Sequence, residues 1–331
     1  MPPLVSIVTL NWNQAAVTCE LLDSLARVTY PRVEVLVVDN GSAPSDLATL
    51  RAHFPRPRLV CSPTNLGFTG GNNLGMRLAR GEYVLLLNND TEVEPDFLEP
   101  LVAAMEADPG IGAASPKIRY YHEPERIQYA GGTAVDPLRG QARWVGSGEV
   151  DRGQHDRSGE TEMGHGAALL IRRRVLEEVG LLGGDYFIYY EELDFGTRLR
   201  RAGWRAHYAA ESVVWHKESV TVGKASPLKT EFQTRNRLLY LRRNAAGWRR
   251  AFALAWVGGL VTPSHALRHA IRGQWAHVRA VGRGLAWHAS HPRARDLAPD
   301  ERLRPSHRAV PHRHAARTRP APLRPLAPVS R

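Results

Sequence analysis

The first 110 residues alternate between short apolar runs and helical segments, and this alternation constrains the fold of the chain more than any other feature. Four runs rich in β-branched and other apolar residues have the length of buried strands, at residues 4–10, 33–38, 59–61 and 83–87. Predicted helices follow them, at residues 17–25, 47–50, 70–80 and 96–107. Repeated strand–helix alternation predicts an α/β protein with a doubly wound, mostly parallel sheet.

Beyond residue 110 the pattern is less regular. Residues 120–160 lose periodicity and fill with Gly, Arg, Asp and His, which predicts a surface excursion with a hairpin. Further strands are predicted at residues 166–171, 206–208 and 213–215. Further helices are predicted at residues 173–179, 191–203, 227–245 and 248–289, the last interrupted near Gly258 and Pro263.

The charge divides the chain into unequal parts. Residues 1–215 carry 21 Lys and Arg against 28 Asp and Glu, whereas residues 216–331 carry 23 against 5. We therefore predict a catalytic domain over 1–225, a basic helical appendage over 226–290, and a disordered Pro/Arg-rich tail over 291–331. The tail has too few apolar residues to bury a core.

Two cysteines, Cys19 and Cys61, lack the spacing of a metal site, and we interpret both as reduced core thiols. The N-terminus shows no signal peptide. The longest apolar run, residues 251–262, is shorter than the roughly 20 residues that span a bilayer. These features predict a cytoplasmic protein, with peripheral attachment to the inner face of the cell membrane as a further expectation.

Polar residues follow three of the predicted strands at their carboxyl ends, where open parallel sheets bind ligands. They are Thr9-Leu10-Asn11-Trp12-Asn13, Asp39-Asn40-Gly41-Ser42 and Asn88-Asn89-Asp90. A glycine-rich stretch, Asn65 to Gly75, opens a helix whose N-terminal N–H groups could face an anion. Neither a GxGxxG fingerprint nor a Walker loop follows the first strand, which argues against dehydrogenases and P-loop proteins.

Two groups of residues carry the chemistry. Asp90 stands at the sheet's rim, where one carboxylate plus diphosphate oxygens would hold Mg²⁺ or Mn²⁺. His216 ends another strand and could add an imidazole, although a lone histidine is more often structural. Glu191, Glu192 and Asp194 follow two tyrosines, and such carboxylates can act as a general base. The alternative is that they stabilise a helix N-terminus through its dipole.

Together these motifs resemble the family 2 glycosyltransferases, in particular the bacterial rhamnosyltransferase-like branch with the GT-A fold. The resemblance runs from Val5 to about His216, and more weakly to about Asn244. Six motifs occur in the family's order: residues 5–13, 37–42, 65–73, 87–90, 191–204 and 215–217. Each motif is modest by itself, but six in order are highly specific.

The resemblance implies an inverting transfer of a sugar, with rhamnose one candidate, from a nucleotide-diphosphate donor to a glycan or lipid-linked hydroxyl in cell-surface polysaccharide synthesis. It implies that Thr9, Asn11 and Asp39 hold the base and ribose, and that Asp90 and His216 hold the cation. It also implies that Glu192 is the base, with Glu191 and Asp194 as rivals. Asn65, Gly67 and Asn72 would line the donor pocket.

Two departures from the family pattern qualify this implication. Glu192 stands where the family usually has the aspartate that serves as base, and Gly183-Gly184 replace an Asp-Glu pair. The glycines predict a looser loop or a different acceptor. They keep open a catalytically weak scaffold that binds nucleotide sugars. A nucleotidyltransferase is disfavoured, because residues 11–14 lack the required Gly-rich, basic loop.

The predicted helices at 246–290 interleave arginines with tryptophans and leucines. Such helices suit an anionic membrane surface, but they could equally pack on the catalytic domain with a solvated basic face. No nucleic-acid motif is present, and we expect no nucleic-acid partner.

Overall fold

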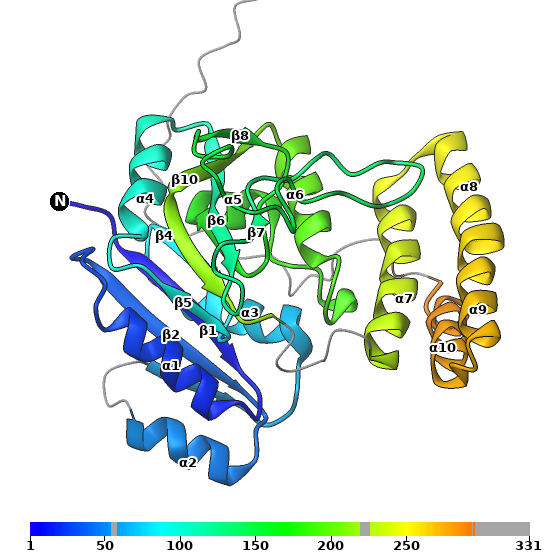
Figure 1. The fold of residues 1–331 in the computed structure, drawn as a ribbon, viewed down its shortest axis with the longest axis horizontal. Helices are drawn as coiled ribbons and strands as arrows, with labels where there is room; N and C mark the ends of the chain where they lie inside the picture. Colours follow the sequence, from blue (N-terminus) through cyan, green and yellow to red (C-terminus); the bar gives the residue numbers. More distant parts are fainter. Residues whose placement is uncertain (54–57, 219–225, 293, 295–331) are drawn as a thin grey trace, which may run out of the picture.

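The computed structural model describes residues 1–53, 58–218, 226–292 and 294. One mixed sheet forms the centre of the catalytic part (Figure 1), with the strand order β3-β2-β1-β4-β9-β6-β10-β5. The strands on this path are β1 (Val5–Asn11), β2 (Val33–Asn40), β3 (Arg58–Ser62), β4 (Tyr83–Leu87), β5 (Thr91–Val93), β6 (Ile111–Tyr120), β9 (Ala168–Arg172) and β10 (Arg205–His216).

Helices cover both faces of this sheet, as a doubly wound fold requires. They are α1 (Ala15–Leu25), α2 (Pro44–His53), α3 (Gly67–Leu78), α4 (Leu98–Ala107), α5 (Arg173–Val179) and α6 (Glu191–Arg201). Alternate residues of β4 point to opposite faces: Leu85 packs in the core with α1 and α4, and Leu86 packs with α3, α5 and α6. The run of apolar residues in β4 therefore reflects burial on both faces.

The parallel part of the sheet is β3-β2-β1-β4, in agreement with the prediction from the first 110 residues. Strand order reverses at β1, since β2 and β3 lie on one side of it and β4 on the other. Such a reversal opens a crevice beyond the carboxyl ends of the strands. Beyond β4 the sheet is mixed, because β9 runs antiparallel to both β4 and β6.

Two predictions in this region need correction. The two short strands expected at residues 206–208 and 213–215 are one strand, β10, with an irregularity between Ala209 and Val213. The excursion at residues 120–160 does contain a hairpin-like ladder, but it is not wholly at the surface. Its strand β7 (Ile127–Tyr129) is buried and pairs with β6, and β8 (Gly159–Thr161) pairs with β10.

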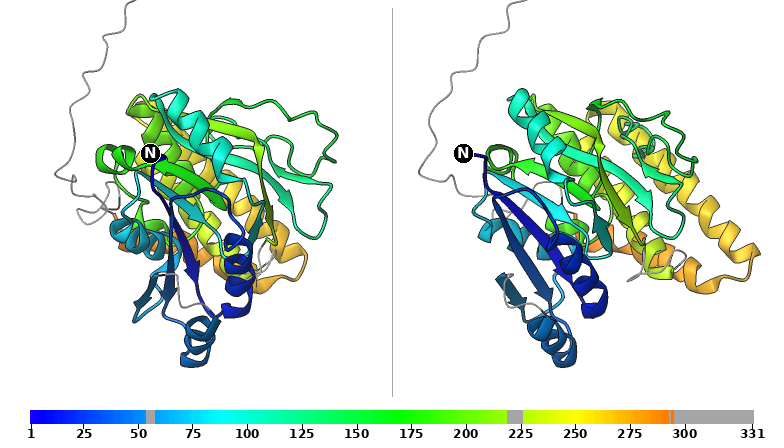
Figure 2. Two further views of the ribbon diagram at one scale, coloured as in Figure 1. Left: turned by 90° about the vertical axis from the view of Figure 1, so that its left-hand side faces the viewer. Right: turned by 60° about the vertical axis from the view of Figure 1, so that its left-hand side comes forward.

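The C-terminal helices stack beside the catalytic part (Figure 1; Figure 2 gives two other views), with α7 nearest to it. They are α7 (Pro227–Asn244), α8 (Gly247–Trp256), a π-helix (Val257–Val261), α9 (Thr262–Ile271) and α10 (Trp275–Ser290). Leu238, Leu239 and Leu241 of α7 share a buried cluster with Tyr186 and Leu193. The first of these helices is thus packed against the elements that precede it.

The predicted interruption near Gly258 and Pro263 is wrong in position. The two glycines lie in the π-helix, which continues α8 into α9, and Pro263 follows as the second residue of α9. The chain turns instead at Gly273, whose φ is +69°. The predicted tail from residue 291 lies almost wholly outside the described residues.

Both cysteines are free, but only one is in the core. Cys19 is buried between α1 and the sheet, whereas Cys61 of β3 is exposed, which corrects the expectation of two core thiols. Strand β3 forms one edge of the sheet and leaves part of its surface open to solvent. No helix within the described part of the chain combines the length and apolar character that crossing a bilayer demands.

Candidate active site

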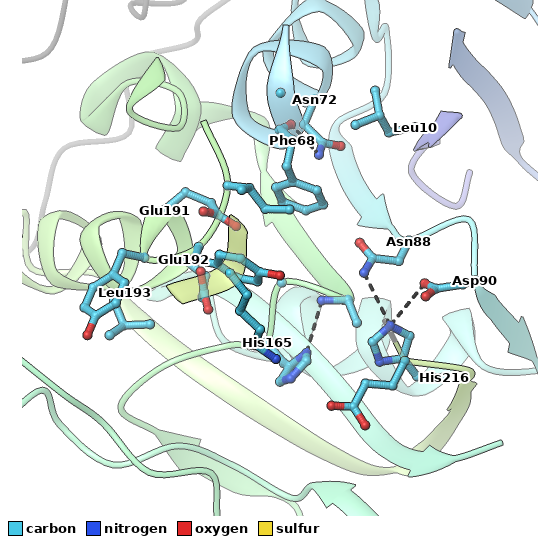
Figure 3. A pocket seen from close by; sticks show the side chains of 18 of the residues that line it. Leu10, Phe68, Asn72, Asn88, Asp90, His165, Glu191, Glu192, Leu193 and His216 are labelled. Atoms are coloured by element: carbon cyan, nitrogen blue, oxygen red, sulfur yellow. Dashed lines mark hydrogen bonds and ion pairs between the residues drawn. The ribbon is translucent and has the colours of Figure 1, made fainter. Parts of the chain in front are cut away.

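A cavity of about 570 Å³ opens beyond the carboxyl ends of β1 and β4. One side is formed by the ends of these strands and the start of α3, and the other by the excursion, the segment 187–193 and the start of α7. Figure 3 shows its two chemical groups: Glu191 and Glu192 on one side, Asp90 and His216 on the other. The cavity therefore brings together polar residues that lie more than 100 positions apart.

The predicted nucleotide-binding residues at the ends of β1 and β2 are buried, and two of them, Asn11 and Asp39, are hydrogen-bonded to each other. The amide of Asn11 donates to Asp39 Oδ1 at 3.0 Å and to Asp46 Oδ2 at 2.7 Å, and its oxygen accepts from Thr18. Thr9, Asn11 and Asp39 are buried and lie outside the cavity lining, whereas their neighbours Leu10, Trp12 and Asn40 line it. These polar residues therefore lie behind the residues that line the cavity.

The glycine-rich stretch does not form a free loop, because its residues from Gly67 on belong to α3, which begins with the turn at Gly67. Asn40 holds this turn: its side chain donates to the Gly67 carbonyl at 3.1 Å and accepts from the Leu66 N–H at 2.9 Å. Gly67 has a φ of +73°, and a Cβ there would lie 2.4 Å from the ring of Phe187. Asn65, Gly67 and Asn72 all line the cavity, as predicted from the sequence.

Asp90 and His216 meet through the pairing of β5 with β10. Register places His216 opposite Thr91, and the Lys217 N–H donates to the Asp90 carbonyl at 2.8 Å. His216 Nε2 lies 3.1 Å from Asp90 Oδ1, and its Nδ1 lies 2.8 Å from Gln128 Oε1. Because Gln128 accepts a hydrogen from Nδ1, a neutral His216 keeps its Nε2 lone pair directed toward Asp90.

This pair fits a divalent cation that is shared with a ligand. A carboxylate oxygen and an imidazole nitrogen, both almost fully buried, face one cavity. Among the described residues no three His, Cys, Asp or Glu side chains form a complete metal cluster. Mg²⁺ and Mn²⁺ at such sites usually take their remaining ligands from phosphate oxygens and water, so the two residues suffice for a cation on a diphosphate.

Glu191 and Glu192 begin α6 across the cavity from this pair. Burial raises the pKa of both carboxyls, and the neighbouring Glu192 charge raises that of Glu191 further, well above its usual range. Oε2 of each carboxyl is buried with no hydrogen-bond partner among the described residues. A pair of this kind is suited to hold one proton and to accept another from a substrate hydroxyl.

Comparison with known proteins agrees with this geometry. The profile of the family described as Glycosyl transferase family 2 matches residues 6–180, more than half of the chain. The chain belongs to glycosyl transferase family 2. The matched segment contains Asp90 and the whole parallel part of the sheet, whereas the carboxylates of α6 and His216 follow it.

Relatives of this glycosyltransferase act in the synthesis of cell-envelope glycans. It is 26% identical to an N-acetylglucosaminyl-diphospho-decaprenol L-rhamnosyltransferase of Mycobacterium tuberculosis over 80% of this chain and 93% of the relative. It is also 26% identical to the O-antigen biosynthesis protein RfbC of Myxococcus xanthus, over 95% of this chain but 24% of that protein. These similarities support the rhamnosyltransferase-like branch of the family.

Solved glycosyltransferases share the fold. A mannosyltransferase of Pyrobaculum calidifontis, in complex with GDP-Man and Mn²⁺, superposes with a TM-score of 0.54 at 20% identity, over 88% of this chain and 76% of that chain. The Staphylococcus aureus protein TarS (residues 1–349) gives 0.53 at 16% identity, over 88% and 82%. The GT-A fold predicted from the sequence is thereby confirmed.

Asp194, the third candidate carboxylate of the glycosyltransferase, does not line the cavity. It is buried, with Arg198 Nε at 2.7 Å from Oδ2, and Tyr186 and Asn244 donating to Oδ1. Its oxygens are occupied by these donors, so its position supports the i, i+4 ion pair and the packing of α7 against α6.

Gly183 and Gly184 do not loosen their loop, contrary to one expectation. A Cβ on Gly183 would lie 2.8 Å from Arg243 and 3.0 Å from the ring of Tyr186. Gly184 begins a short 3-10 turn, and its carbonyl accepts a hydrogen bond from Thr69. The glycines therefore allow α7 and α3 to approach the loop closely.

The sequence interpretation missed a group of cavity residues in the excursion and just after it. Gln128, Trp144 and His165 all line the cavity. The His165 ring packs 5.1 Å from that of Trp144, and its Nδ1 accepts from the Ala167 N–H. Burial lowers the pKa of His165 to about 3, with a smaller effect of His216, so the ring is neutral. No periodicity marks these residues, and their neighbours in space come from distant strands.

Proposed function

We propose that this glycosyltransferase is an inverting, divalent-cation-dependent enzyme that transfers a sugar from a nucleotide-diphosphate donor to a lipid-linked glycan hydroxyl. The observation that carries the proposal is the placement of two chemical groups across one cavity. The Asp90–His216 pair suits the diphosphate, and the Glu191–Glu192 pair suits an incoming hydroxyl. The mycobacterial relative, named for transfer of L-rhamnose to a lipid diphosphate, supports the acceptor class.

On the donor side, different residues would bind different parts of the nucleotide sugar. Thr9, Asn11 and Asp39 form the polar group beneath the nucleoside end, while Trp12 and Asn40 present the surface above it. Asn65, Gly67 and Asn72 line the adjoining wall. Asp90 and His216 would hold Mg²⁺ or Mn²⁺ on the diphosphate. The bound cation would act as a Lewis acid that stabilises the charge on the leaving diphosphate.

On the acceptor side, Glu192 would act as the general base. Its carboxylate takes the proton of the acceptor hydroxyl while the hydroxyl oxygen attacks the anomeric carbon. The bond from that carbon to the donor phosphate oxygen breaks on the opposite face, so configuration inverts in a single displacement. Glu191, whose pKa is raised further, would keep its proton and so leave Glu192 as the ionised member of the pair.

The donor sugar that we favour is rhamnose, in the assembly of a cell-surface polysaccharide. One relative supports this sugar by name, as an L-rhamnosyltransferase, and the other supports polysaccharide synthesis, as an O-antigen biosynthesis protein. A lipid-linked acceptor also requires that the enzyme work at the cytoplasmic membrane surface, and the C-terminal helices offer a face for that contact.

Seven large apolar side chains are exposed along α8, the π-helix, α9 and the start of α10. The first six form an apolar stripe on the continuous helix of α8, the π-helix and α9, mostly at intervals of four residues, and the seventh follows the turn at Gly273. They are Trp248, Phe252, Trp256, Leu260, Leu267, Ile271 and Trp275. Residues 246–290 contain six arginines and neither Asp nor Glu. An apolar stripe with tryptophans and flanking arginines suits the interface of an anionic membrane.

Vesicle flotation of the full chain tests this contact. Changing both Phe252 and Trp256 to Ser should sharply reduce binding to vesicles with anionic lipid, since burial of aromatic area on the stripe is lost. Val150→Ser, at another exposed apolar residue on the excursion, should bind like the parent. Equal flotation of all three proteins would remove the membrane proposal without affecting the transfer reaction.

The transfer proposal is tested by donor hydrolysis. Purified protein with Mn²⁺ or Mg²⁺ is offered a panel of nucleotide sugars, and free nucleoside diphosphate is measured before and after adding a lipid-diphosphate acceptor. Release from one donor that stops with chelator would support the enzyme and identify its sugar. Binding of a donor in a thermal-shift assay, with no release even with acceptor, would instead support a nucleotide-sugar-binding scaffold.

A further inference from the structure

The segment that leads into α6 has an unusual backbone. Phe187, Tyr189 and Tyr190 have φ values of 63°, 70° and 75°, in the left-handed region that bulky residues rarely adopt. Tyr190 is the N-cap of α6, so Glu191 and Glu192 follow this turn directly. A conformation of this kind persists only where surrounding contacts determine it, and such turns gather at functional sites.

Two residues of α7, Arg235 and Asn236, provide those contacts. The Asn236 amide nitrogen lies 2.8 Å from each of three backbone carbonyls, those of Tyr186, Ile188 and Tyr189. An Arg235 terminal nitrogen donates to the carbonyls of Asp185 and Tyr186, at 2.8 and 2.6 Å. Among these carbonyls, that of Tyr186 also accepts from the Ile188 N–H at 2.7 Å, and the side chains of α7 satisfy the others.

The pair is itself rigidly held. Asn236 is fully buried, and its oxygen accepts from Arg235 Nε at 2.8 Å. The Arg235 guanidinium lies over the rings of Phe232 and Trp287, at 4.4 and 4.8 Å from their centroids. Each planar group thus has its donors aimed at the turn by contacts on its other sides.

The turn is fixed from the donor side as well. The Thr69 N–H in the first turn of α3 donates to the Phe187 carbonyl at 3.1 Å. The Phe187 ring packs on Gly67 and stacks on Phe232 at a centroid distance of 5.2 Å. The turn therefore lies between the donor-binding helix α3 and α7, and it connects both to the carboxylates of α6.

We propose that Arg235 and Asn236 are positioning residues for glycosyl transfer. By holding the carbonyls of residues 185–189, they place Glu191 and Glu192 where the acceptor hydroxyl loses its proton. Neither residue lines the cavity, so their effect passes through the turn. This inference rests on the proposed function, and it assigns a role in the reaction to a helix outside the matched family segment.

The test compares Asn236→Ala with Arg242→Ala in the full chain. Arg242 is on the same helix and also donates to backbone carbonyls, but to those of residues 291 and 292, away from the turn. We expect Asn236→Ala to lower kcat for transfer about 100-fold with donor Kd unchanged, because misplacement of a catalytic group by about 1 Å has that effect. Arg242→Ala should keep the parent kcat.

Amide hydrogen exchange gives a readout that does not require turnover. Peptides covering residues 185–193 should exchange faster in Asn236→Ala than in the parent, and at the parent rate in Arg242→Ala. If Asn236→Ala does not fold, Arg235→Lys serves instead, since it keeps the charge but loses the guanidinium fork. It should show a smaller loss of kcat with the same exchange pattern.

The results separate the two proposals. Unchanged exchange in the turn, or a loss of donor affinity that matches the loss of kcat, would overturn the positioning role. A parent protein that turns over no donor would instead contradict the proposed function. In that case faster exchange in the turn, confined to Asn236→Ala, would still support the placement of the carboxylates by α7.

Discussion

The two sides of the cavity are built by different means. Apart from His216, the donor side consists of strand ends and a helix start that follow one another in sequence, within residues 10–90. The acceptor side is assembled from the excursion, the turn at 187–190 and α7, which lie far apart along the chain. The short motifs of the donor side therefore remain recognisable in a single sequence, whereas the acceptor side depends on contacts between distant elements.

This difference has a functional consequence. The donor side must bind a nucleotide diphosphate, a ligand common to the family, with groups supplied by the parallel sheet. The acceptor side must match a particular glycan and sets the position of the carboxylates. We therefore expect substitutions on the donor side to abolish binding and transfer together, and substitutions on the acceptor side to affect transfer alone.

The largest effect should come from Asp90→Ala on the donor side. Loss of a buried carboxylate from the cation pair should lower kcat/KM on the order of 10⁴-fold, since a Lewis acid contributes several kcal/mol to such reactions. Metal-dependent donor binding, measured by calorimetry with and without Mn²⁺, should weaken as well. Asp96→Ala is the control, because this carboxylate is exposed and lies outside the cavity lining. Turnover near the parent rate would show that Asp90 holds no cation.

Glu192→Gln should distinguish the acceptor side from the donor side, because it should affect transfer without affecting donor binding. The amide keeps the size of the side chain but cannot take a proton, so transfer should fall about 10³-fold while donor binding stays intact. Glu191→Gln should have a smaller effect, because burial and the neighbouring Glu192 raise the pKa of Glu191 further and favour Glu192 as the ionised member of the pair. A rate for Glu192→Gln close to that of the parent would exclude Glu192 as the base.

The same carboxyl should control the pH profile. The base must be ionised to work, and burial raises its pKa above the ordinary value of about 4.3. As pH falls through the raised pKa, the base is protonated and kcat should decline at a higher pH than an exposed glutamate would give. An acid limb at or below pH 4.3 would contradict this assignment.

The donor side of the site could be predicted because its residues sit beside periodic elements. Asn65, Gly67, Asn72 and Asp90 all line the cavity as expected, and the four parallel strands occur where the apolar runs place them. Burial of Asn11 and Asp39 behind the lining could not be foreseen, because it depends on how α1 and α2 pack. The direction of the strands beyond β4 also could not be predicted, because the periodicity of a strand does not say which strand it pairs with.

The acceptor side shows more clearly which parts of a site a sequence pattern does not predict. Residues 120–160 have no periodicity, yet Gln128 of buried β7, a strand that pairs with β6, lies 2.8 Å from the ring of His216 in β10. Arg235 and Asn236 look like polar residues of an ordinary basic helix, and only the structure shows which carbonyls they meet. A strained turn of three aromatic residues likewise leaves no sequence signature, because aromatics disfavour positive φ.

Substitution of Gln128 should have the smallest effect of these changes. It also tests whether the two sides of the cavity are independent, because Gln128 belongs to the excursion but acts on the Asp90–His216 pair. Its oxygen, 2.8 Å from His216 Nδ1, selects the tautomer whose Nε2 lone pair faces Asp90. Gln128→Leu removes that acceptor at similar size. It should weaken Mn²⁺-dependent donor binding by about 10- to 100-fold, as does loss of the hydrogen-bond partner of a histidine that holds a metal ion. Gln128→Glu keeps an acceptor at Nδ1 and should retain most of the affinity. If Gln128→Leu lowers kcat without changing the Mn²⁺ dependence, the excursion serves the acceptor alone, and the two sides of the cavity are independent.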